Sequence, residues 1–129
     1  MAARILLSGI VIILLPLLKS LGETYEVSDG LYSFTAGLHT SVFIISGSGC
    51  IIIDPMNTEH KKQMLQEIKN ITIEPIKYVY YSYNRWDHTA GRQVFKDVGA
   101  KIVAHSEAYE WIKANLGNDV VFPDQIWPA

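Results

Sequence analysis

The chain has 129 residues, of which 49% are hydrophobic and 19% are charged, a balance typical of one small globular domain. Its formal net charge is −2, and beyond residue 22 nine lysine and arginine residues accompany thirteen aspartate and glutamate residues. A net acidic chain without basic clusters lacks the usual footprint of nucleic-acid binding, so no nucleic-acid partner is expected.

Residues 1–22 have the layout of a secretory signal peptide. Arg4 precedes an apolar run, and Ser20 and Gly22 place small residues where a signal peptidase would cleave. The uncharged run 5–18 is fourteen residues long, which is short for a bilayer span of roughly 20 residues. An uncleaved membrane anchor is the alternative interpretation. We predict that 1–22 is removed and that 23–129 is secreted or otherwise extracytoplasmic.

Short strands come first in the chain that follows. Apolar and β-branched residues predict strands at 25–27, 31–36, 41–45 and 50–53. The glycines and serines of 46–49 predict a hairpin connection between the last two strands. A phosphate-binding loop is the alternative for this segment, but such a loop leads into a helix, whereas this one leads into a strand.

Helices and strands then alternate along the chain. Trp111 and Ile112 are expected on the buried face of the last helix, and the tail 120–129 has no regular period. The fold class is therefore α/β, with a mixed sheet and flanking helices. The predicted elements are a helix at 57–69 capped by Asn57, a strand at 76–82, a short helix ending at Gly99, a strand at 101–104 and a helix starting at Ser106.

Two single residues carry information about export. Cys50 is the one cysteine of the chain, so no internal disulfide can form. It lies in an apolar run, where a free thiol packs as a small hydrophobic side chain. Asn70 begins the sequence Asn-Ile-Thr, a glycosylation acceptor if the chain enters a eukaryotic secretory pathway.

The segment 81–91, with the sequence YSYNRWDHTAG, contains the strongest candidates for metal binding or acid–base chemistry. Asp87 and His88 stand between a predicted strand and a predicted helix, at the carboxyl end of a strand, where ligand sites of α/β sheets tend to lie. A carboxylate beside an imidazole can bind a metal, form an acid–base pair or cap the helix. Residue types alone leave these alternatives open.

The surrounding pattern resembles the metallo-β-lactamase superfamily of metal-dependent hydrolases. The resemblance is carried by Ile-Asp-Pro at 53–55 after an apolar strand, by IKYVYYS at 76–82, by WDHTAG at 86–91 and by QVFKDVGAKIVAH at 93–105. It covers 24–129, but only the N-terminal half of the family's domain. The resemblance implies a partial domain at 23–129, half of a four-layer αββα sandwich, beside a site that holds two zinc ions in the family.

The family's loop signature is His-x-His-x-Asp-His, and this sequence departs from it at two positions. Asp87 and His88 match the last two metal ligands, and Asp87 is the candidate catalytic residue. Tyr83 and Arg85 stand where the family has its first two histidines. A phenol with a pKa near 10 is a poor ligand, and a guanidinium has no free lone pair. Two ligands do not make a catalytic zinc site, which needs about three.

Other polar residues fall near the same loop. Asp54 ends its strand on the same edge, and the family's equivalent aspartate organises the site without binding metal. His60 is predicted to be exposed on a polar helix face, and His105 to lie at the entry of the next helix. His39 precedes a strand that the family places beside the site, and it is a candidate to face that groove.

Three functions follow from these observations. The first is a metallo-β-lactamase-like hydrolase domain that is truncated and lacks a competent metal site. The second is a non-catalytic secreted binding protein that self-associates through the bare face of its sheet. The third is a working hydrolase of a lactam, lactone, thioester or other ester, if the true chain continues past residue 129. A small-molecule substrate is expected only if the protein is active.

Overall fold

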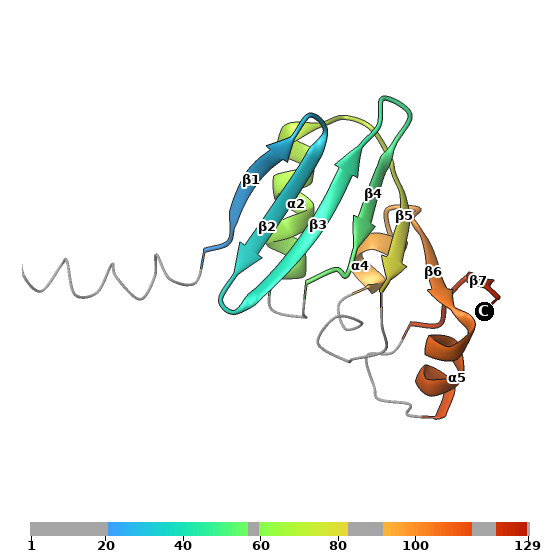
Figure 1. Cartoon of the computed structure of the whole chain (residues 1–129). Coiled ribbons are helices and arrows are strands. Elements are labelled where there is room, and N and C mark those ends of the chain that lie inside the picture. Colours follow the sequence, from blue (N-terminus) through green and yellow to red (C-terminus); the bar gives the residue numbers. More distant parts are fainter. Residues whose placement is uncertain (1–20, 57–59, 83–91, 115–120, 129) are drawn as a thin grey trace, which may run out of the picture.

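A computed structural model describes residues 21–56, 60–82, 92–114 and 121–128. Ten elements occupy these ranges (Figure 1). Seven strands form one sheet in the spatial order β1-β2-β3-β4-β5-β6-β7. The elements are β1 (Glu23–Ser28), β2 (Leu31–Ala36), β3 (His39–Ile45), β4 (Cys50–Ile53), α2 (Lys61–Ile71), β5 (Ile76–Tyr81), α4 (Gln93–Lys96), β6 (Lys101–His105), α5 (Ser106–Ala114) and β7 (Gln125–Trp127).

The sheet is mixed because two kinds of connection join its strands. Hairpins join β1, β2, β3 and β4 in succession, and neighbouring strands in this group pair antiparallel. Each later strand is reached through a helix, and β4 to β7 pair parallel. Such a crossover is the usual route between neighbouring parallel strands, since a tight turn cannot reverse the chain twice. The predicted mixed α/β sheet is confirmed.

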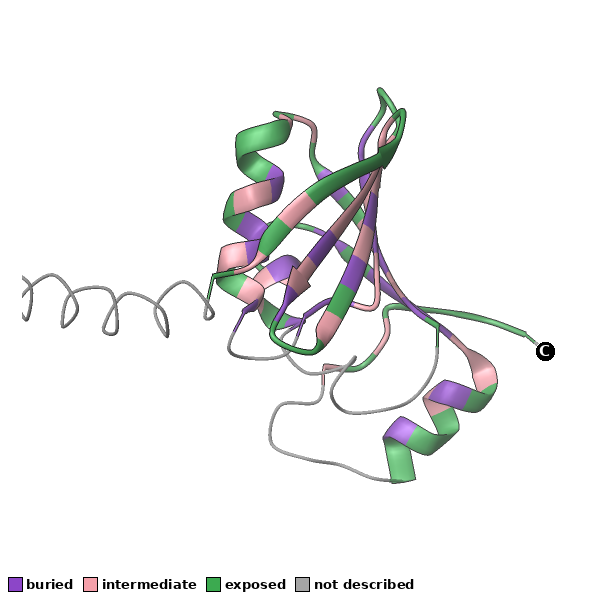
Figure 2. Ribbon diagram, turned by 60° about the vertical axis from the view of Figure 1, so that its left-hand side comes forward, coloured by how far each residue is buried: buried purple, intermediate pink, exposed green. Residues whose placement is uncertain are grey.

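One face of the sheet carries α2 and α4, which lie behind the strands in Figure 1 and to one side of them in Figure 2. Alternate strand residues point to this face, and the side chains of Phe34, Phe43, Ile52, Val79 and Ile102 are fully buried there. Met64, Leu65 and Ile68 of α2 complete the core, at the i, i+1, i+4 spacing of an apolar stripe on one helix face. Cys50 is also fully buried, as predicted.

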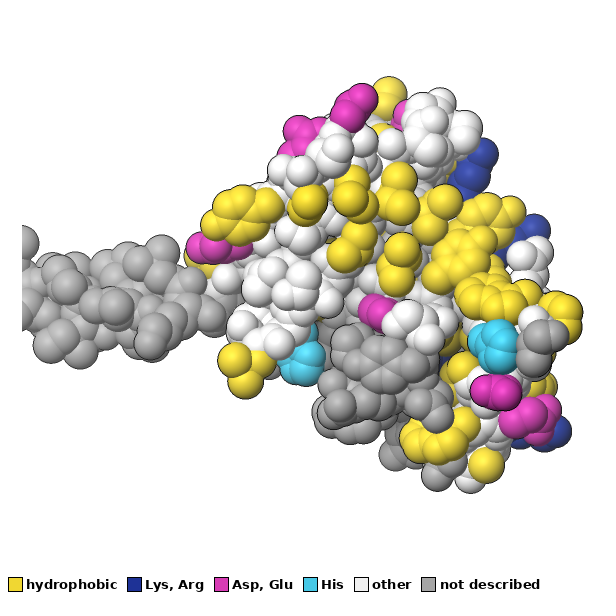
Figure 3. Space-filling model, viewed as in Figure 1, with side chains coloured by type: hydrophobic (Ala, Val, Ile, Leu, Met, Phe, Trp, Pro, Cys, Tyr) yellow, Lys and Arg dark blue, Asp and Glu magenta, His cyan; other side chains and the backbone are white. Residues whose placement is uncertain are grey.

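The opposite face carries no helix in the described part of the chain, and hydrophobic side chains run across it (Figure 3). We call this surface the open face. The strand register arranges it in rows that cross the sheet. Row one consists of Leu31, Ile44, Ile51, Tyr78 and Lys101, and row two of Tyr25, Ser33, Val42, Ile53, Tyr80, Val103 and Gln125.

Three expectations from the sequence are wrong. The tail contains a strand, β7, which pairs with β6. Trp111 is 43% exposed, and Ile112 alone of that pair is buried, because α5 packs against the end of β6 with a narrow face. His60 is buried at the start of α2, whose first turn sits close under the sheet. Asn57, the predicted cap of this helix, lies outside the described residues, and the N-cap position is His60.

Two further expectations concern the chain ends and the surface. The predicted signal peptide lies almost wholly outside the described residues, and no helix within the described ranges is long and apolar enough to cross a membrane. Asn70 is exposed in the last turn of α2, where its side-chain oxygen accepts a hydrogen bond from Gln66 Nε2 at 3.0 Å. The predicted glycosylation of Asn70 stays a prediction.

Asp124 forms hydrogen bonds that connect the chain to β6 immediately before β7. Its backbone N–H donates to the Ile102 carbonyl at 2.8 Å, and its Oδ2 accepts from the Ile102 N–H at 2.9 Å. Lys96 Nζ lies 2.8 Å from Oδ1. The hydrogen bond from Ile102, with help from Lys96, holds the pKa of the Asp124 carboxyl below its ordinary value. The ionised form therefore stabilises the position of β7.

We expect Asp124→Asn to lower the free energy of unfolding by about 0.5–1 kcal/mol at neutral pH. Because the folded-state pKa of Asp124 lies below its unfolded value, its contribution is present above about pH 4 and is lost as the pH falls through the folded value. Urea titrations between pH 2 and pH 7 should therefore show the variant and the wild type converging in acid. A constant difference at every pH would contradict this role for the charge.

Candidate functional site

The carboxyl ends of β4, β5 and β6 meet at one edge of the sheet, because these strands run parallel. Ser82, the last described residue before 83–91, follows β5 at this edge. Asp54 and Ser82 are the first residues after β4 and β5, and His105 is the last residue of β6. This is the edge at which α/β sheets commonly hold their ligands.

Asp54 joins the ends of two neighbouring strands. Its N–H donates to the Tyr80 carbonyl at 2.9 Å. Its Oδ1 accepts from the Ser82 N–H at 2.8 Å, and its Oδ2 accepts from the Ser82 hydroxyl. The backbone φ of Asp54 is +52°, a left-handed conformation that aspartate and asparagine adopt more readily than other residues with a side chain. The carboxylate thus fixes the residue from which segment 83–91 starts.

Three histidines fall along the same edge. The register of β3, in which Val42 pairs with Ile53, places His39 beyond the end of β4. His60 lies at the N-terminus of α2. Nδ1 of His105 accepts a hydrogen bond from the Glu107 N–H at 3.3 Å, which confirms the predicted position at a helix entry. The His105 ring also meets Trp127 edge-on, with 6.2 Å between the ring centroids.

Arg92, the first described residue after 83–91, is fully buried, which no local sequence pattern predicts. Its guanidinium carbon lies 3.9 Å from the centroid of the Tyr81 ring, and Nη1 donates to the Val121 carbonyl. Within the described residues, Nε and Nη2 find no hydrogen-bond partner. Burial lowers the pKa of Arg92 to about 9, so the side chain is still charged at neutral pH. Within the described residues the cation contacts the face of the Tyr81 ring and the Val121 carbonyl.

The four residues of the predicted metal loop, Tyr83, Arg85, Asp87 and His88, lie outside the described residues. The described ranges alone contain no group of three or more His, Cys, Asp or Glu side chains able to hold a metal ion. The chemistry of the donor set decides whether the residues suit the zinc site that the resemblance implies. Asp87 and His88 supply two donors, fewer than a catalytic zinc site requires, so the residues present do not fit it.

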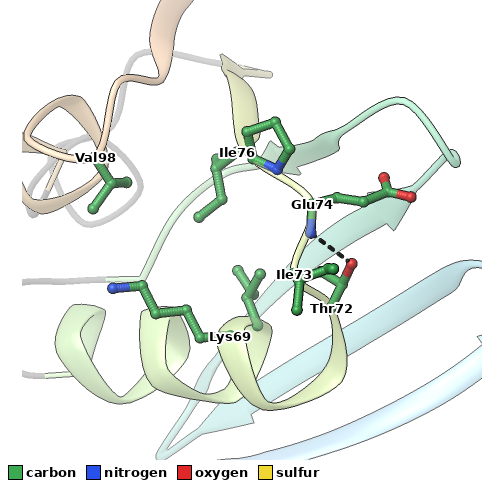
Figure 4. A pocket seen from close by; sticks show the side chains of 8 residues that line it. Lys69, Thr72, Ile73, Glu74, Ile76 and Val98 are labelled. Carbon is green, nitrogen blue, oxygen red and sulfur yellow. Dashed lines mark hydrogen bonds between the residues drawn. The ribbon is translucent and has the colours of Figure 1, made fainter.

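A separate groove lies at the opposite ends of the parallel strands. Its volume is about 440 Å³, and it is bounded by the end of α2, the start of β5 and Val98. Figure 4 shows Lys69, Ile76 and Val98 around the opening, while the carboxylate of Glu74 points away from it. Because this groove lies at the amino ends of the parallel strands, it is distinct from the edge that Asp54 occupies.

Known structures match this arrangement closely. A metallo-β-lactamase from Pontibacter korlensis superposes with a TM-score of 0.73 at 17% identity, covering 82% of this chain and 52% of that one. The fold is half of a metallo-β-lactamase domain. The chain spans about half the length of the structures it matches. No protein-family model matches the sequence, and no curated protein matches it.

Two further metallo-β-lactamases support the same fold. One is from Legionella gormanii, with a TM-score of 0.69 at 19% identity over 81% of this chain and 46% of that one. The other is from Cronobacter sakazakii, and its name includes the words HARLDQ motif. It reaches a TM-score of 0.69 at 21% identity over 84% of this chain and 47% of that one. The resemblance drawn from the sequence is confirmed at the level of the fold.

Asp54 offers a direct test of how the start of the loop is held. Asp54→Ala removes both hydrogen bonds to Ser82 and leaves alanine at φ +52°. We expect a loss of about 2–3 kcal/mol in the free energy of unfolding. Asp54→Asn keeps an acceptor for the Ser82 N–H and tolerates the left-handed backbone, so its loss should stay within about 1 kcal/mol. Urea denaturation measures both values.

Hydrogen exchange at the Ser82 amide provides the local control. Exchange should accelerate in Asp54→Ala and change little in Asp54→Asn. Equal stability losses, or an unchanged Ser82 amide in Asp54→Ala, would contradict the assignment of Asp54 as the anchor of this edge.

Proposed function

We propose that this chain is a metallo-β-lactamase-like hydrolase domain without a competent metal site of its own. The observation that carries the proposal is the combination of a retained scaffold and an altered loop. The fold matches half of a metallo-β-lactamase, and Asp54 holds Ser82 at the carboxyl ends of the strands, directly before 83–91 in the sequence. The sequence of that loop lacks the first two histidines of the signature.

The two replacements differ in whether a matched structure shares them. When the motif HARLDQ in the name of the Cronobacter sakazakii structure is placed in order on 83–88, it shares its arginine with Arg85 and its aspartate with Asp87. Arginine at the third position is therefore compatible with this fold. That motif retains histidine at its first position, where this chain has Tyr83. At the signature positions the two loops therefore differ twice: Tyr83 stands in place of the first histidine, and His88 in place of the final glutamine.

Arg85 also suggests what takes the place of the missing cation. Residues two apart in an extended segment project toward the same side, so Arg85 could reach the carboxylate of Asp87. A guanidinium can donate paired hydrogen bonds to a carboxylate. We propose that this ion pair occupies the former metal position. In an exposed setting it contributes only about 0–1 kcal/mol, so its role is to neutralise Asp87 and not to stabilise the fold.

Two wider functions remain as proposals beside this one. If a longer protein supplies the missing histidines and aspartate from a second half, the assembled domain would hydrolyse a small molecule such as a lactam, lactone, thioester or other ester. The open face favours the alternative of a non-catalytic secreted binding protein, because a bare apolar sheet is a contact surface that needs no metal.

Zinc titration tests the metal-site proposal. We expect calorimetry of the wild-type chain to show no zinc binding in the micromolar range or tighter. Tyr83→His/Arg85→His, which restores four ligand side chains with Asp87 and His88, should bind zinc at least about tenfold more tightly. Tyr83→Asn/Arg85→Asn is the matched control, because it removes the same two side chains without adding imidazoles. Micromolar binding by the wild type would show that the loop is a metal site after all.

Expression in a eukaryotic secretory host tests the export proposal. The arrangement of Arg4, the apolar run and the small residues Ser20 and Gly22 predicts release of a chain that begins at Glu23. N-terminal sequencing of the medium identifies the new end, and an Asn70→Gln variant controls for a shift in mass caused by glycosylation. Recovery of intact Met1 in the membrane fraction would instead identify 1–22 as an anchor.

A further inference from the structure

Arg92 and Tyr81 form a buried polar pair with three unused hydrogen-bond donors. Tyr81 is the last residue of β5, Arg92 directly precedes α4, and both side chains are fully buried. Within the described residues, four buried side-chain atoms lack a hydrogen-bond partner, and three of them are Tyr81 Oη, Arg92 Nε and Arg92 Nη2. Buried polar groups are normally hydrogen-bonded, so three such atoms on two side chains in contact indicate a bound group.

The charge of Arg92 is not balanced by its contacts with described residues. Its guanidinium carbon lies 3.9 Å from the centroid of the Tyr81 ring. The ring face attracts a cation, but it does not replace hydrogen bonds in the plane of the guanidinium. Nη1 donates to the Val121 carbonyl, which is a neutral acceptor. A buried cation is costly unless it is both paired with an opposite charge and hydrogen-bonded, so an anion suits this position.

The unused donors of Arg92 lie on one edge of the guanidinium. Nε–H and one N–H of Nη2 point in parallel because the group is planar, and this edge matches the two oxygens of a carboxylate. The third unused donor, the Tyr81 hydroxyl, belongs to the ring over which the guanidinium lies. The arrangement of donors therefore favours a planar oxyanion over a spherical halide ion.

We propose that the Nε–Nη2 edge of Arg92, assisted by the Tyr81 hydroxyl, binds the carboxylate group of a small free ligand. The complete burial of both side chains limits the size of that ligand, so formate and acetate represent the class that fits. Tyr81 belongs to the core on the helix-covered side of the sheet, whereas its neighbour Tyr80 is in row two. The carboxylate site is thus separate from the open face.

An ordered water molecule is the alternative occupant. Buried waters typically make about three hydrogen bonds, and a water that accepts from Arg92 and donates to Tyr81 Oη still needs an acceptor for its second hydrogen. The fourth unpartnered atom, Glu74 Oε2, is an acceptor. Glu74 precedes β5 whereas Tyr81 ends it, so the length of the strand, roughly 20 Å, separates them. Water would also leave the charge of Arg92 unpaired, and both points favour an anion.

Titration with formate, observed through the arginine Nε–H signals in NMR spectra, tests the site. The chain has three arginine residues, and Arg4→Lys and Arg85→Lys identify two of the signals, so Arg92 is assigned without altering it. At about pH 6 both formate and the guanidinium are charged. We expect the Arg92 signal to shift and to saturate with a dissociation constant in the millimolar range or tighter. Sodium chloride at the same ionic strength should cause no saturable shift.

Three variants separate the contributions of the two side chains. Tyr81→Phe keeps the ring beneath Arg92 and removes the third donor, so formate should bind at least about threefold more weakly. Tyr80→Phe is the matched control, because it loses the same hydroxyl from the neighbouring residue, and its formate affinity should equal that of the wild type. Arg92→Lys keeps the charge without the paired donors and should bind formate at least about tenfold more weakly.

Three results would overturn the proposal. If the Arg92 signal of the wild type shows no saturable shift, water and not a carboxylate faces this edge. If the signal lies at low field without formate and returns upfield on acidification, a carboxylate of the protein itself occupies the edge. Equal formate affinities of the wild type and Arg92→Lys would show a general attraction to positive charge and no carboxylate site.

Discussion

The pairing of β4 on both sides is the constraint on which the rest of the structure depends. Its four residues, Cys50–Ile53, bond antiparallel to β3 and parallel to β5. They are all apolar, so β4 contributes Cys50 and Ile52 to the core and Ile51 and Ile53 to the open face. Because β4 is the last strand of the hairpins and the first of the crossovers, its carboxyl end sets where the candidate site can lie. Asp54 is the residue at that point.

The edge that follows from this pairing is held by contacts of Asp54 and Arg92. Asp54 accepts a hydrogen bond from Ser82, which precedes 83–91. Arg92, which follows 83–91, stacks on the Tyr81 ring and donates to the Val121 carbonyl. The Asp54 contact with Ser82 is exposed, whereas the Arg92 contacts with Tyr81 and Val121 are made by a fully buried side chain. The residues that make these contacts are thus different from the residues of the family's loop signature, which lie at 83–88.

Local patterns were enough to predict most of the elements, because alternation in the strands and the apolar stripe of α2 are properties of short segments. They failed where a distant contact decides the outcome. β7 exists because Asp124 bonds to Ile102, 22 residues away in the sequence. His60 is buried because α2 packs on the sheet. Trp111 is exposed because α5 packs against the end of β6 with a narrow face. Asp54 could be singled out through the family pattern, whereas nothing near Arg92 in the sequence indicates a buried cation.

The burial of Cys50 governs how the protein behaves toward oxidants. Removal of the thiol from water, with a smaller effect of Glu74, raises its pKa to about 12. Since the thiolate is the form that attacks disulfides, the folded chain is inert in an oxidising compartment although it carries an unpaired cysteine. Only an unfolded chain presents that sulfur to another molecule. A disulfide between two Cys50 residues would therefore be a record of earlier unfolding, chemically separate from any association of folded chains.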